Sequence, residues 1–210
     1  MILPRDCLYT VQSVYWPTAN DERLQYVTHM PHLRELNLER APISDAVLKH
    51  LSGLTQLTYL EMEETPITDA GLRHLNGCRR LKHMWFSETQ LTDASLPWIG
   101  KNRGLTHLAL AGTAVSDAGV EHLARHKELQ VLALHETKVT SRVTTTLKQL
   151  PQLQFLYLMR TEIDDAAVTE LCELTNLQQL DVRFTKITPS GQQQLKQALP
   201  RCQVEVWPKS

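Results

Sequence analysis

Leucine returns along the chain every 24 residues, without a single insertion. The leading leucines are Leu33, Leu57, Leu81, Leu105, Leu129, Leu153 and Leu177. Three and five residues after each of them stand further apolar residues, such as Leu36 and Leu38, with other residues between them. Alternation with a period of two is typical of a short strand that buries one face. We therefore expect seven registered repeats, each beginning with a strand.

The rest of each repeat predicts a turn and a short helix. A threonine stands eight residues after most of the leading leucines, at Thr65, Thr89, Thr113, Thr137, Thr161 and Thr185. We expect its hydroxyl to bond the backbone of the turn that leaves the strand. Pairs such as Thr68-Asp69 then suit a helix start, because the helix dipole favours a negative charge in the first turn. Apolar residues three apart, such as Leu72 and Leu75, give the helix one buried stripe.

Repeat five departs from this pattern. Ser141-Arg142-Val143-Thr144 replaces the Asp-Ala-Gly-Leu of other repeats, and two more threonines follow. Because β-branched residues weaken a helix, we expect a looser segment here, extended or 3₁₀. A partner site on this convex side is the alternative.

One strand-turn-helix unit cannot bury its own apolar face, so the repeats must stack. The predicted fold class is α/β: a leucine-rich solenoid or arc, with a parallel sheet of about eight strands on the concave face and short helices on the convex face. We expect a single domain over 1–210. Residues 1–32 form an N-terminal cap and degenerate repeat, 33–200 the seven repeats, and 201–210 a capping strand that buries Val204 and Val206.

The repeat L-x-x-L-x-L-x-x-T-x-I-T-D-A-G-L-x-x-L-x-x-L-x-x is matched best by Leu57 to Arg80 and Leu105 to Glu128. It resembles the leucine-rich-repeat family, especially bacterial proteins with TDAGL-type repeats, over nearly the whole chain. The resemblance implies a horseshoe that binds partners on its concave strand face. The repeat is also similar to the cysteine-containing repeats of F-box substrate receptors, but the chain has no F-box segment and no cysteine ladder.

Composition narrows the classes of partner and the cellular compartment that we expect for the protein. The 22 Lys and Arg residues balance 23 Asp and Glu residues, so no overall field attracts nucleic acid or an anionic membrane. The chain has no run of eighteen apolar residues, and Met1 to Cys7 lacks the pattern of a secretion signal. Cys7, Cys78, Cys172 and Cys202 form no CxxC pair, which argues against a zinc site and a disulfide framework. We expect a soluble cytoplasmic protein with free thiols and no cofactor, which binds neither nucleic acid nor membrane.

The candidate site is the concave face, where the side chains between the buried leucines point away from the core. Large apolar side chains gather there without a role in the core, at Tyr59, Trp85, Phe155, Tyr157, Met159 and Phe184. A floor of small residues, at Ala109, Ala111, Gly112 and Ala133, predicts a shallow depression between Trp85 and Tyr157. Glu61, His83, His107 and Arg183 complete the predicted partner-binding surface. The alternative is that the aromatic residues only pack against one another across strands.

Charge is polarised along this face. Acidic residues concentrate in repeats one to three, at Glu35, Glu39, Glu61, Glu63, Glu64 and Glu88, whereas Arg160 and Arg183 lie toward the other end. This distribution predicts a protein partner that carries basic charge. Two alternatives are a self-associating scaffold, with a weak homodimer formed through the same patch or a terminal strand, and a substrate-recognition subunit of a larger complex.

Two histidines raise the question of a metal or an active site. His83 and His107 are neighbours across the predicted sheet, but zinc normally takes three or four ligands, so we predict no metal. Catalysis would need a site built from these histidines and Glu61. The chain has none of the familiar catalytic motifs, so we predict a protein that is not an enzyme.

On the outer side of the repeats, equivalent positions 24 residues apart form columns, several of which are polar. We expect His50, His74 and His122, with Trp98 in the same column, to be solvated surface residues. Basic residues gather where helices return to strands, at Arg79, Arg103 and Lys127, with Arg80, Lys82, Lys101 and Arg125 nearby. Their simplest role is to complement helix C-termini. The alternative is contact with a phosphate-rich or acidic partner.

Overall fold

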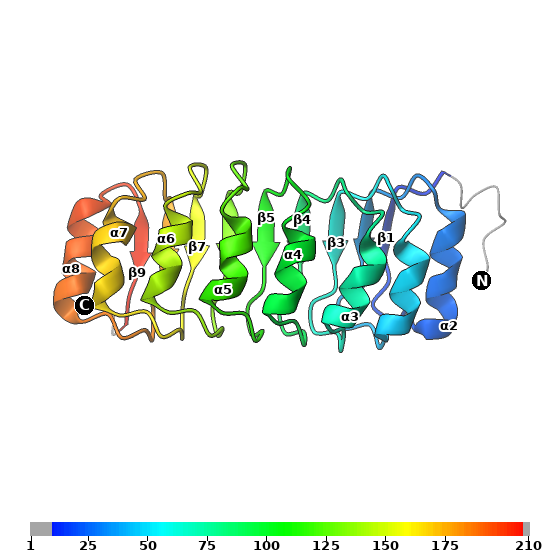
Figure 1. Ribbon diagram of the computed structural model, residues 1–210, viewed down its shortest axis with the longest axis horizontal. Helices are drawn as coiled ribbons and strands as arrows, with labels where there is room; N and C mark the ends of the chain where they lie inside the picture. Colours follow the sequence, from blue (N-terminus) through cyan, green and yellow to red (C-terminus); the bar gives the residue numbers. More distant parts are fainter. Residues whose placement is uncertain (1–9, 208–210) are drawn as a thin grey trace.

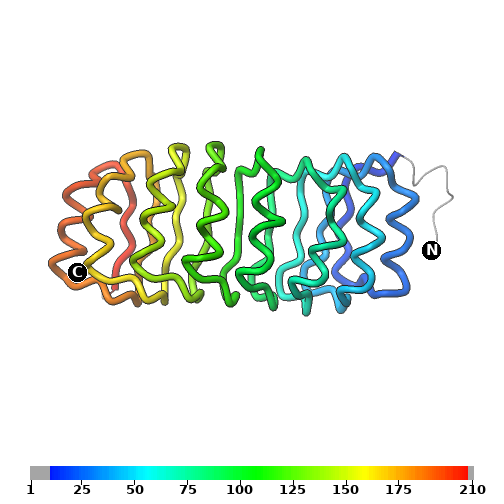
Figure 2. The backbone as a smooth tube through the Cα atoms, viewed as in Figure 1, coloured from blue at the N-terminus to red at the C-terminus, as the bar shows by residue number. Residues whose placement is uncertain are grey.

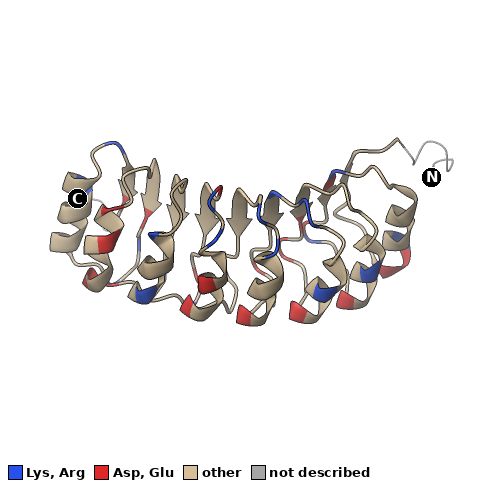
Figure 3. Ribbon diagram, turned by 45° about the horizontal axis from the view of Figure 1, so that its top comes forward, with Lys and Arg blue, Asp and Glu red and all other residues tan. Residues whose placement is uncertain are grey.

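The computed structural model describes residues 10–207 as a curved solenoid, in which strands and short helices form two layers (Figure 1). The backbone winds from one end to the other with a regular pitch (Figure 2). The helices follow the outer side of the curve (Figure 3). The leucine-rich arc predicted from the repeat is therefore confirmed. The predictions made for Met1 to Cys7, and for Cys7 as a free thiol, lie outside the described residues.

Parallel strands form one open sheet in chain order. Within residues 10–207 the sheet has nine strands: β1 (Ser13–Tyr15), β2 (Glu35–Asn37), β3 (Tyr59–Glu61), β4 (His83–Trp85), β5 (His107–Ala109), β6 (Val131–Ala133), β7 (Phe155–Tyr157), β8 (Gln179–Asp181) and β9 (Gln203–Glu205). From β2 onward each residue pairs with the one 24 positions later, so Tyr59 lies opposite His83. The expected number of about eight was too low, because Ser13–Tyr15 pairs with β2 despite its degenerate sequence.

The helical layer consists of short α and 3₁₀ segments, the latter labelled η. They are α2 (Asp21–Leu24), η1 (Gln25–His29), η2 (Asp45–Leu51), α3 (Asp69–Leu72), η3 (Arg73–Leu75), η4 (Asp93–Ser95), α4 (Leu96–Ile99), α5 (Asp117–Val120), η5 (Glu121–Leu123), η6 (Ser141–Val143), α6 (Thr144–Leu147), η7 (Asp165–Ala167), α7 (Val168–Cys172) and α8 (Pro189–Ala198). The last of these begins with proline, whose fixed φ suits the first helical turn, and it buries Leu195 at the end of the stack.

The prediction for repeat five was correct in part: Ser141–Val143 is the expected 3₁₀ turn, but the repeat is not looser than its neighbours. Segments η6 and α6 continue the helical layer there, with the same order of 3₁₀ and α turns as η4 and α4. Thr144 and Thr146 are buried, and the Thr144 hydroxyl donates to the Ser141 carbonyl at 2.8 Å. Packing between neighbouring repeats therefore outweighs the weak helix propensity of threonine.

The leading leucines, and the residues three and five positions after them, form one continuous core along the solenoid. Trp98 also belongs to this core and is only 7% exposed, so its expected place on the solvated surface was wrong. Side-by-side helices leave little room between repeats, and a side chain as large as indole fills that room instead of reaching water. His74 and His122 are exposed and His50 is half-buried.

The first-turn aspartates bond the next repeat. The carboxylate of Asp45 accepts from the backbone N–H of Thr68 at 2.8 Å and from its hydroxyl at 2.6 Å. The same pair of bonds joins Asp21 to Ser44, Asp69 to Thr92, Asp93 to Ser116, Asp117 to Thr140 and Asp165 to Thr188. A Cβ atom at Gly71 would collide with the Asp45 carboxylate. The Thr-Asp-Ala-Gly motif is therefore an inter-repeat staple, in addition to the helix start that we expected.

The threonine ladder is confirmed. Each hydroxyl donates to the carbonyl three residues earlier, from Thr65 to Met62, Thr89 to Phe86, Thr113 to Leu110, Thr137 to Leu134, Thr161 to Leu158 and Thr185 to Val182. The bond lengths are 2.6 to 2.7 Å. The residue just before each threonine has a positive φ, as in Gly112 at +63° and Glu88 at +55°. This left-handed residue turns the chain out of the sheet, and the hydroxyl satisfies a carbonyl that the turn leaves unpaired.

Candidate functional site on the concave face

A row of rings crosses strands β3, β4 and β5 on the concave face. The rings of His83 and His107 lie 4.3 Å apart between centroids, in a tilted arrangement. Tyr59 contacts His83 edge-on at 5.8 Å, and Trp85 lies 6.3 Å from His107. The structure thus brings together four of the predicted site residues: Tyr59, His83 and His107 face one another across the strands at intervals of 24 residues, and Trp85 contacts His107 diagonally.

These rings are less exposed than the sequence suggested. Tyr59, Trp85, Phe155, Tyr157 and Met159 are all half-buried. Neighbouring strands bring side chains of the same face to about 5 Å, so large rings cover one another as cross-strand pairs do. Part of the alternative interpretation is therefore correct: these side chains pack together, and each still presents an edge to solvent.

The small residues in the middle of the face do not form an open floor. Ala109 is 3% exposed, Ala111 1% and Ala133 7%. Larger side chains around them cover the alanines. The indole N–H of Trp85 is buried and has no hydrogen-bond acceptor within residues 10–207.

Carboxylates crowd the N-terminal half of the face. Glu61 accepts hydrogen bonds from the Tyr59 hydroxyl and, at 2.6 Å, from the Asn37 side-chain amide. Burial raises the pKa of Glu63, and the negative charges of Glu61 and Glu39 raise it further. Burial and the hydrogen bond to Glu61 likewise raise the pKa of Tyr59. Because these groups disfavour one another's charge, a cation placed among them would relieve the repulsion.

The basic residues on this face are already paired. Arg183 binds the buried carboxylate of Asp181 at 2.6 Å, so this predicted site residue is held within its own repeat. Arg160 pairs with Glu136 at 2.9 Å. At the other end Arg40 binds Glu64 at 2.7 Å and lies 3.6 Å from Glu39. The predicted polarity therefore persists as an acidic half beside a half whose arginines are neutralised by their own carboxylates.

A second aromatic group lies at the C-terminal end. Phe184 is 46% exposed and stacks on Trp207, which is 54% exposed, with 5.1 Å between ring centroids. The Arg160 guanidinium lies 5.3 Å from the centre of the Phe184 ring. Sequence analysis missed Trp207, and also Tyr15 on β1, which is 67% exposed. Both lie outside the seven registered repeats, and extending the columns into the terminal strands would have revealed them.

The paired histidines His83 and His107 are both half-buried. Burial lowers the pKa of His83 and of His107, and the second effect on His107 comes from His83 itself. Both rings are therefore neutral near pH 7. Within residues 10–207 no group of three or more His, Cys, Asp or Glu side chains is arranged to hold a metal ion.

Comparisons with known proteins agree with this geometry. A family model described as Leucine Rich repeat matches residues 29–51, 101–124 and 173–193. Internalin C2 from Listeria monocytogenes is similar in structure, with a TM-score of 0.78 and 22% identity over 97% of this chain and 84% of that one. An internalin (inlF) from the same organism has a TM-score of 0.58 and 17% identity over 89% and 70% of the two chains.

A plant structure shares the same fold. It is the ectodomain of the membrane receptor kinase GASSHO1/SCHENGEN3 from Arabidopsis thaliana, in complex with CASPARIAN STRIP INTEGRITY FACTOR 2. Its TM-score is 0.61, with 15% identity over 92% of this chain and 23% of that one. No curated protein sequence matches the chain. The repeat sequence and the fold together show that the chain is a solenoid of leucine-rich repeats, and such repeats generally mediate protein–protein interaction.

Two further observations concern the cysteines and the helices. Cys78, Cys172 and Cys202 are free thiols, as predicted, and burial raises the pKa of Cys78 to about 12. Among residues 10–207 no helix has the length and apolar character needed to cross a membrane.

Proposed function

We propose that this protein binds another protein on its concave face, and that the partner presents a basic segment to the acidic half. One observation carries the proposal: Glu39, Glu61 and Glu63 lie together beside the ring row of Tyr59, His83, His107 and Trp85. A face that combines rings with clustered charge of one sign supplies both contact area and orientation. The protein has no catalytic role in this proposal.

The two parts of the face would contribute differently. The carboxylates would steer a lysine- or arginine-rich segment toward β2 and β3. Added salt would weaken this attraction. The half-buried edges of Trp85 and Tyr157 would supply apolar contact farther along the arc. Arg183 would contribute little, because Asp181 already holds its guanidinium.

Quantitative capture from a lysate of the source organism tests this proposal. The bait is the wild-type chain, the Trp85→Ala and Tyr157→Ala double variant, or the Glu39→Lys and Glu63→Lys double variant. We expect both double variants to lose a protein that the wild type retains. Added salt should weaken only the part of the binding that depends on the carboxylates. Glu22→Lys with Glu128→Lys, on exposed positions of the helical side, is the control with the same charge change. Equal retention by all four baits would contradict the proposal.

Self-association is the second candidate. The exposed stack of Phe184 and Trp207 lies beside β9, which pairs with β8 and with no other described strand. An open strand edge next to exposed rings is a common route to dimers. Light scattering over a dilution series tests it, because only self-association makes the mass depend on concentration. Trp207→Ala should then abolish the increase in mass.

We also propose that the protein is bacterial and works in a reducing cytoplasm, supported by the TDAGL-type repeat and by the free thiol of Cys78 in the core. Alkylation of the denatured protein from freshly lysed source cells should label Cys78, Cys172 and Cys202 without prior reduction. Labelling that requires a reductant would contradict this location.

A further inference from the structure

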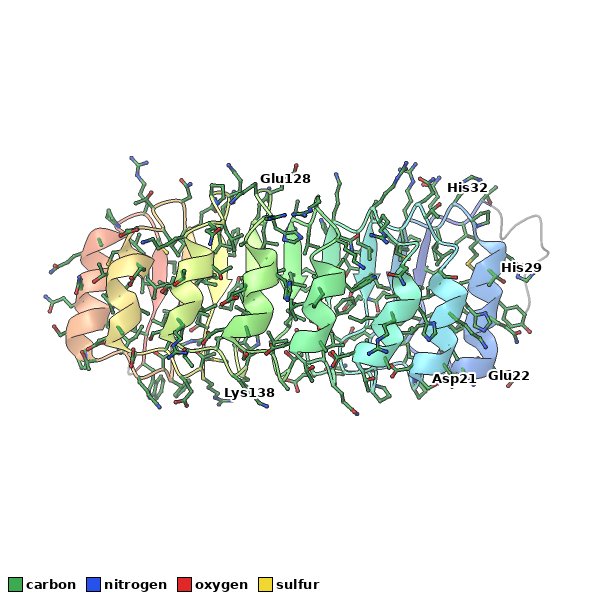
Figure 4. The ribbon with its side chains drawn as sticks, in the orientation of Figure 1. Asp21, Glu22, His29, His32, Glu128 and Lys138 are labelled. Atoms are coloured by element: carbon green, nitrogen blue, oxygen red, sulfur yellow. The ribbon has the colours of Figure 1, made fainter. Side chains whose placement is uncertain are left out.

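A pocket of about 460 Å³ lies on the helical side, at the edge where helices return to strands. Its walls come from three successive repeats: Arg79 from the turn after η3, Lys101 and Arg103 from the turn after α4, and Glu121 and Arg125 from η5 and the turn after it. Figure 3 shows Lys and Arg gathered on the loops of this edge in the middle of the solenoid. In Figure 4 the same edge is marked by Glu128, opposite the edge of Lys138. The pocket has the size of a small-molecule site.

The basic residues of this edge fall into two groups. Lys127 donates to the carbonyls of Ala124 and Gln149 at 3.0 and 2.6 Å, and Arg79 donates through Nε to the carbonyl of Asn76 at 2.6 Å. These two residues complement helix ends, as the simpler sequence-based interpretation predicted. The side chains of Lys101, Arg103 and Arg125 make no hydrogen bond or ion pair with any residue from 10 to 207. Helix capping therefore does not account for the three cations that line the pocket with Arg79.

The core changes at the same two repeats. One buried column runs Met30, Leu54, Cys78, Asn102, His126, Leu150 and Leu174, so it is polar only at Asn102 and His126. Both of these side chains are fully buried. The side-chain amide of Asn102 has no hydrogen-bond partner within residues 10–207, whereas the His126 ring bonds the Leu123 carbonyl through Nδ1 at 3.1 Å. Such buried polar groups destabilise a core, and the pocket is lined mainly by residues of the same two repeats.

Each buried polar residue sits between two cations in the sequence, as Lys101-Asn102-Arg103 and Arg125-His126-Lys127. The corresponding triplets of repeats one, two, five and six carry at most one basic residue: Gly53-Leu54-Thr55, Gly77-Cys78-Arg79, Gln149-Leu150-Pro151 and Glu173-Leu174-Thr175. Gly100 and Ala124, the small residues that precede the two triplets, also line the pocket. Repeats three and four thus differ from the others in three ways together: small residues that line the pocket, pairs of cations and buried polar side chains.

We propose that this pocket is a binding site for a ligand that carries two or more phosphate groups. The four basic side chains of the lining, Arg79, Lys101, Arg103 and Arg125, and the single carboxylate of Glu121 leave a net charge of +3. Two phosphate groups carry about −3 to −4 at neutral pH, which matches this excess, whereas one carboxylate or one phosphate does not. The planar guanidinium groups of Arg103 and Arg125 suit bidentate bonds to phosphate oxygens. The site is separate from the concave face, so its ligand would not compete with the partner bound there.

Calorimetric titration of the full chain with tripolyphosphate tests the proposal. Orthophosphate and sodium chloride at matched ionic strength serve as reference ligands. We expect saturable binding of tripolyphosphate, weakened about tenfold or more by Arg103→Gln with Arg125→Gln. Arg80→Gln with Lys82→Gln removes the same charge from the same edge outside the pocket, and should change the affinity by less than about twofold. The circular dichroism spectrum of each variant verifies that it is folded.

Two further binding measurements identify the chemical class of the ligand. Vesicles of phosphatidylcholine with phosphatidylinositol bisphosphate test whether the phosphates belong to a lipid headgroup. If the vesicles retain the wild-type protein but not the pocket variant, the ligand is a lipid headgroup. If the protein binds tripolyphosphate but not the vesicles, the ligand is soluble. A short polyglutamate peptide tests phosphate against carboxylate. The proposal is overturned if wild type shows no saturable binding of either phosphate ligand, if both double variants weaken equally, or if the peptide binds as tightly as tripolyphosphate.

Discussion

Asp21, at the start of the first helical segment, accepts two hydrogen bonds from Ser44 in the following repeat, from the backbone N–H at 2.8 Å and from the hydroxyl at 2.6 Å. Glu22 lies beside it in the same first turn, at the lower end of α2 in Figure 4. The carboxylate of Glu22 makes no such bond within the described residues. Variants of these two acids therefore distinguish the hydrogen bonds between repeats from the effect of a negative charge on the helix dipole.

Asp21→Ala should lower the free energy of unfolding by about 1 kcal/mol, because both bonds to Ser44 are lost. Glu22→Ala should change it by less than about 0.5 kcal/mol. Urea unfolding followed by circular dichroism measures both. If the two variants lose equal stability, the aspartates act mainly on the helix dipole and the staple is wrong.

Removing one hydroxyl of the threonine ladder should be costly. Thr113→Val keeps the shape of a buried side chain but leaves the Leu110 carbonyl, now bonded at 2.6 Å, without its donor. We expect a loss of about 1 kcal/mol in the free energy of unfolding. Thr145→Val is the matched control, because that threonine is exposed on the helical side. A Thr113→Val protein as stable as wild type would show that the hydroxyl bond contributes nothing net.

The left-handed turn predicts a contrast between two glycines. Gly112 has a φ of +63°, and a Cβ atom there would collide with the Glu88 carboxylate. Gly112→Ala should therefore cost about 1 to 2 kcal/mol. At Gly53 nothing lies within 4 Å of an added Cβ, so Gly53→Ala should be neutral or slightly stabilising. Thermal unfolding of the two variants, compared with wild type, measures the difference.

The buried histidine in the middle of the solenoid predicts a pH dependence. Burial lowers the pKa of His126 below its ordinary value of about 6.5. As pH falls below that value the unfolded chain takes up a proton that the folded protein does not, so stability decreases. His126→Leu should raise the free energy of unfolding and reduce its loss between pH 7.5 and 5.5. His83, His107 and His135, whose pKa values burial also lowers, should maintain part of the slope.

The control for this pH dependence is His74→Leu, on an exposed position of the helical side. It should leave the difference between the two pH values unchanged. An identical pH slope in wild type and His126→Leu would contradict the assignment of the effect to burial of His126.

The sequence predicted the fold well because each repeat obeys the same spacing. Leu60 and Leu108 occupy equivalent buried positions, and the register of 24 residues alone places Tyr59 beside His83. The threonine ladder was predictable for the same reason, since its bonds are local. What spacing did not show was the bond from Asp45 to Thr68, which crosses repeats: the motif was visible, but its partner depends on how the repeats stack.

Exposure was the least predictable property of the site. Trp85 and Tyr157 are half-buried because neighbouring rings cover them, and Trp98 is buried where its column suggested solvent. The pairing of Arg183 with Asp181 also could not be predicted from the sequence. Such details depend on side-chain conformations across adjacent strands. The polar change at Asn102, by contrast, was visible in the sequence, as a break in a column that is otherwise apolar or sulfur-containing apart from the neighbouring His126.

The central claim is that the concave face holds the partner. Photo-crosslinking in the source organism tests it most directly, with p-benzoylphenylalanine placed at Glu35 on the strand side or at Thr145 on the helical side, both of which are exposed. We predict a protein adduct from position 35 that is absent from position 145 and is lost when Trp85→Ala is added. An adduct formed only from position 145, or equally from both positions, would contradict the account.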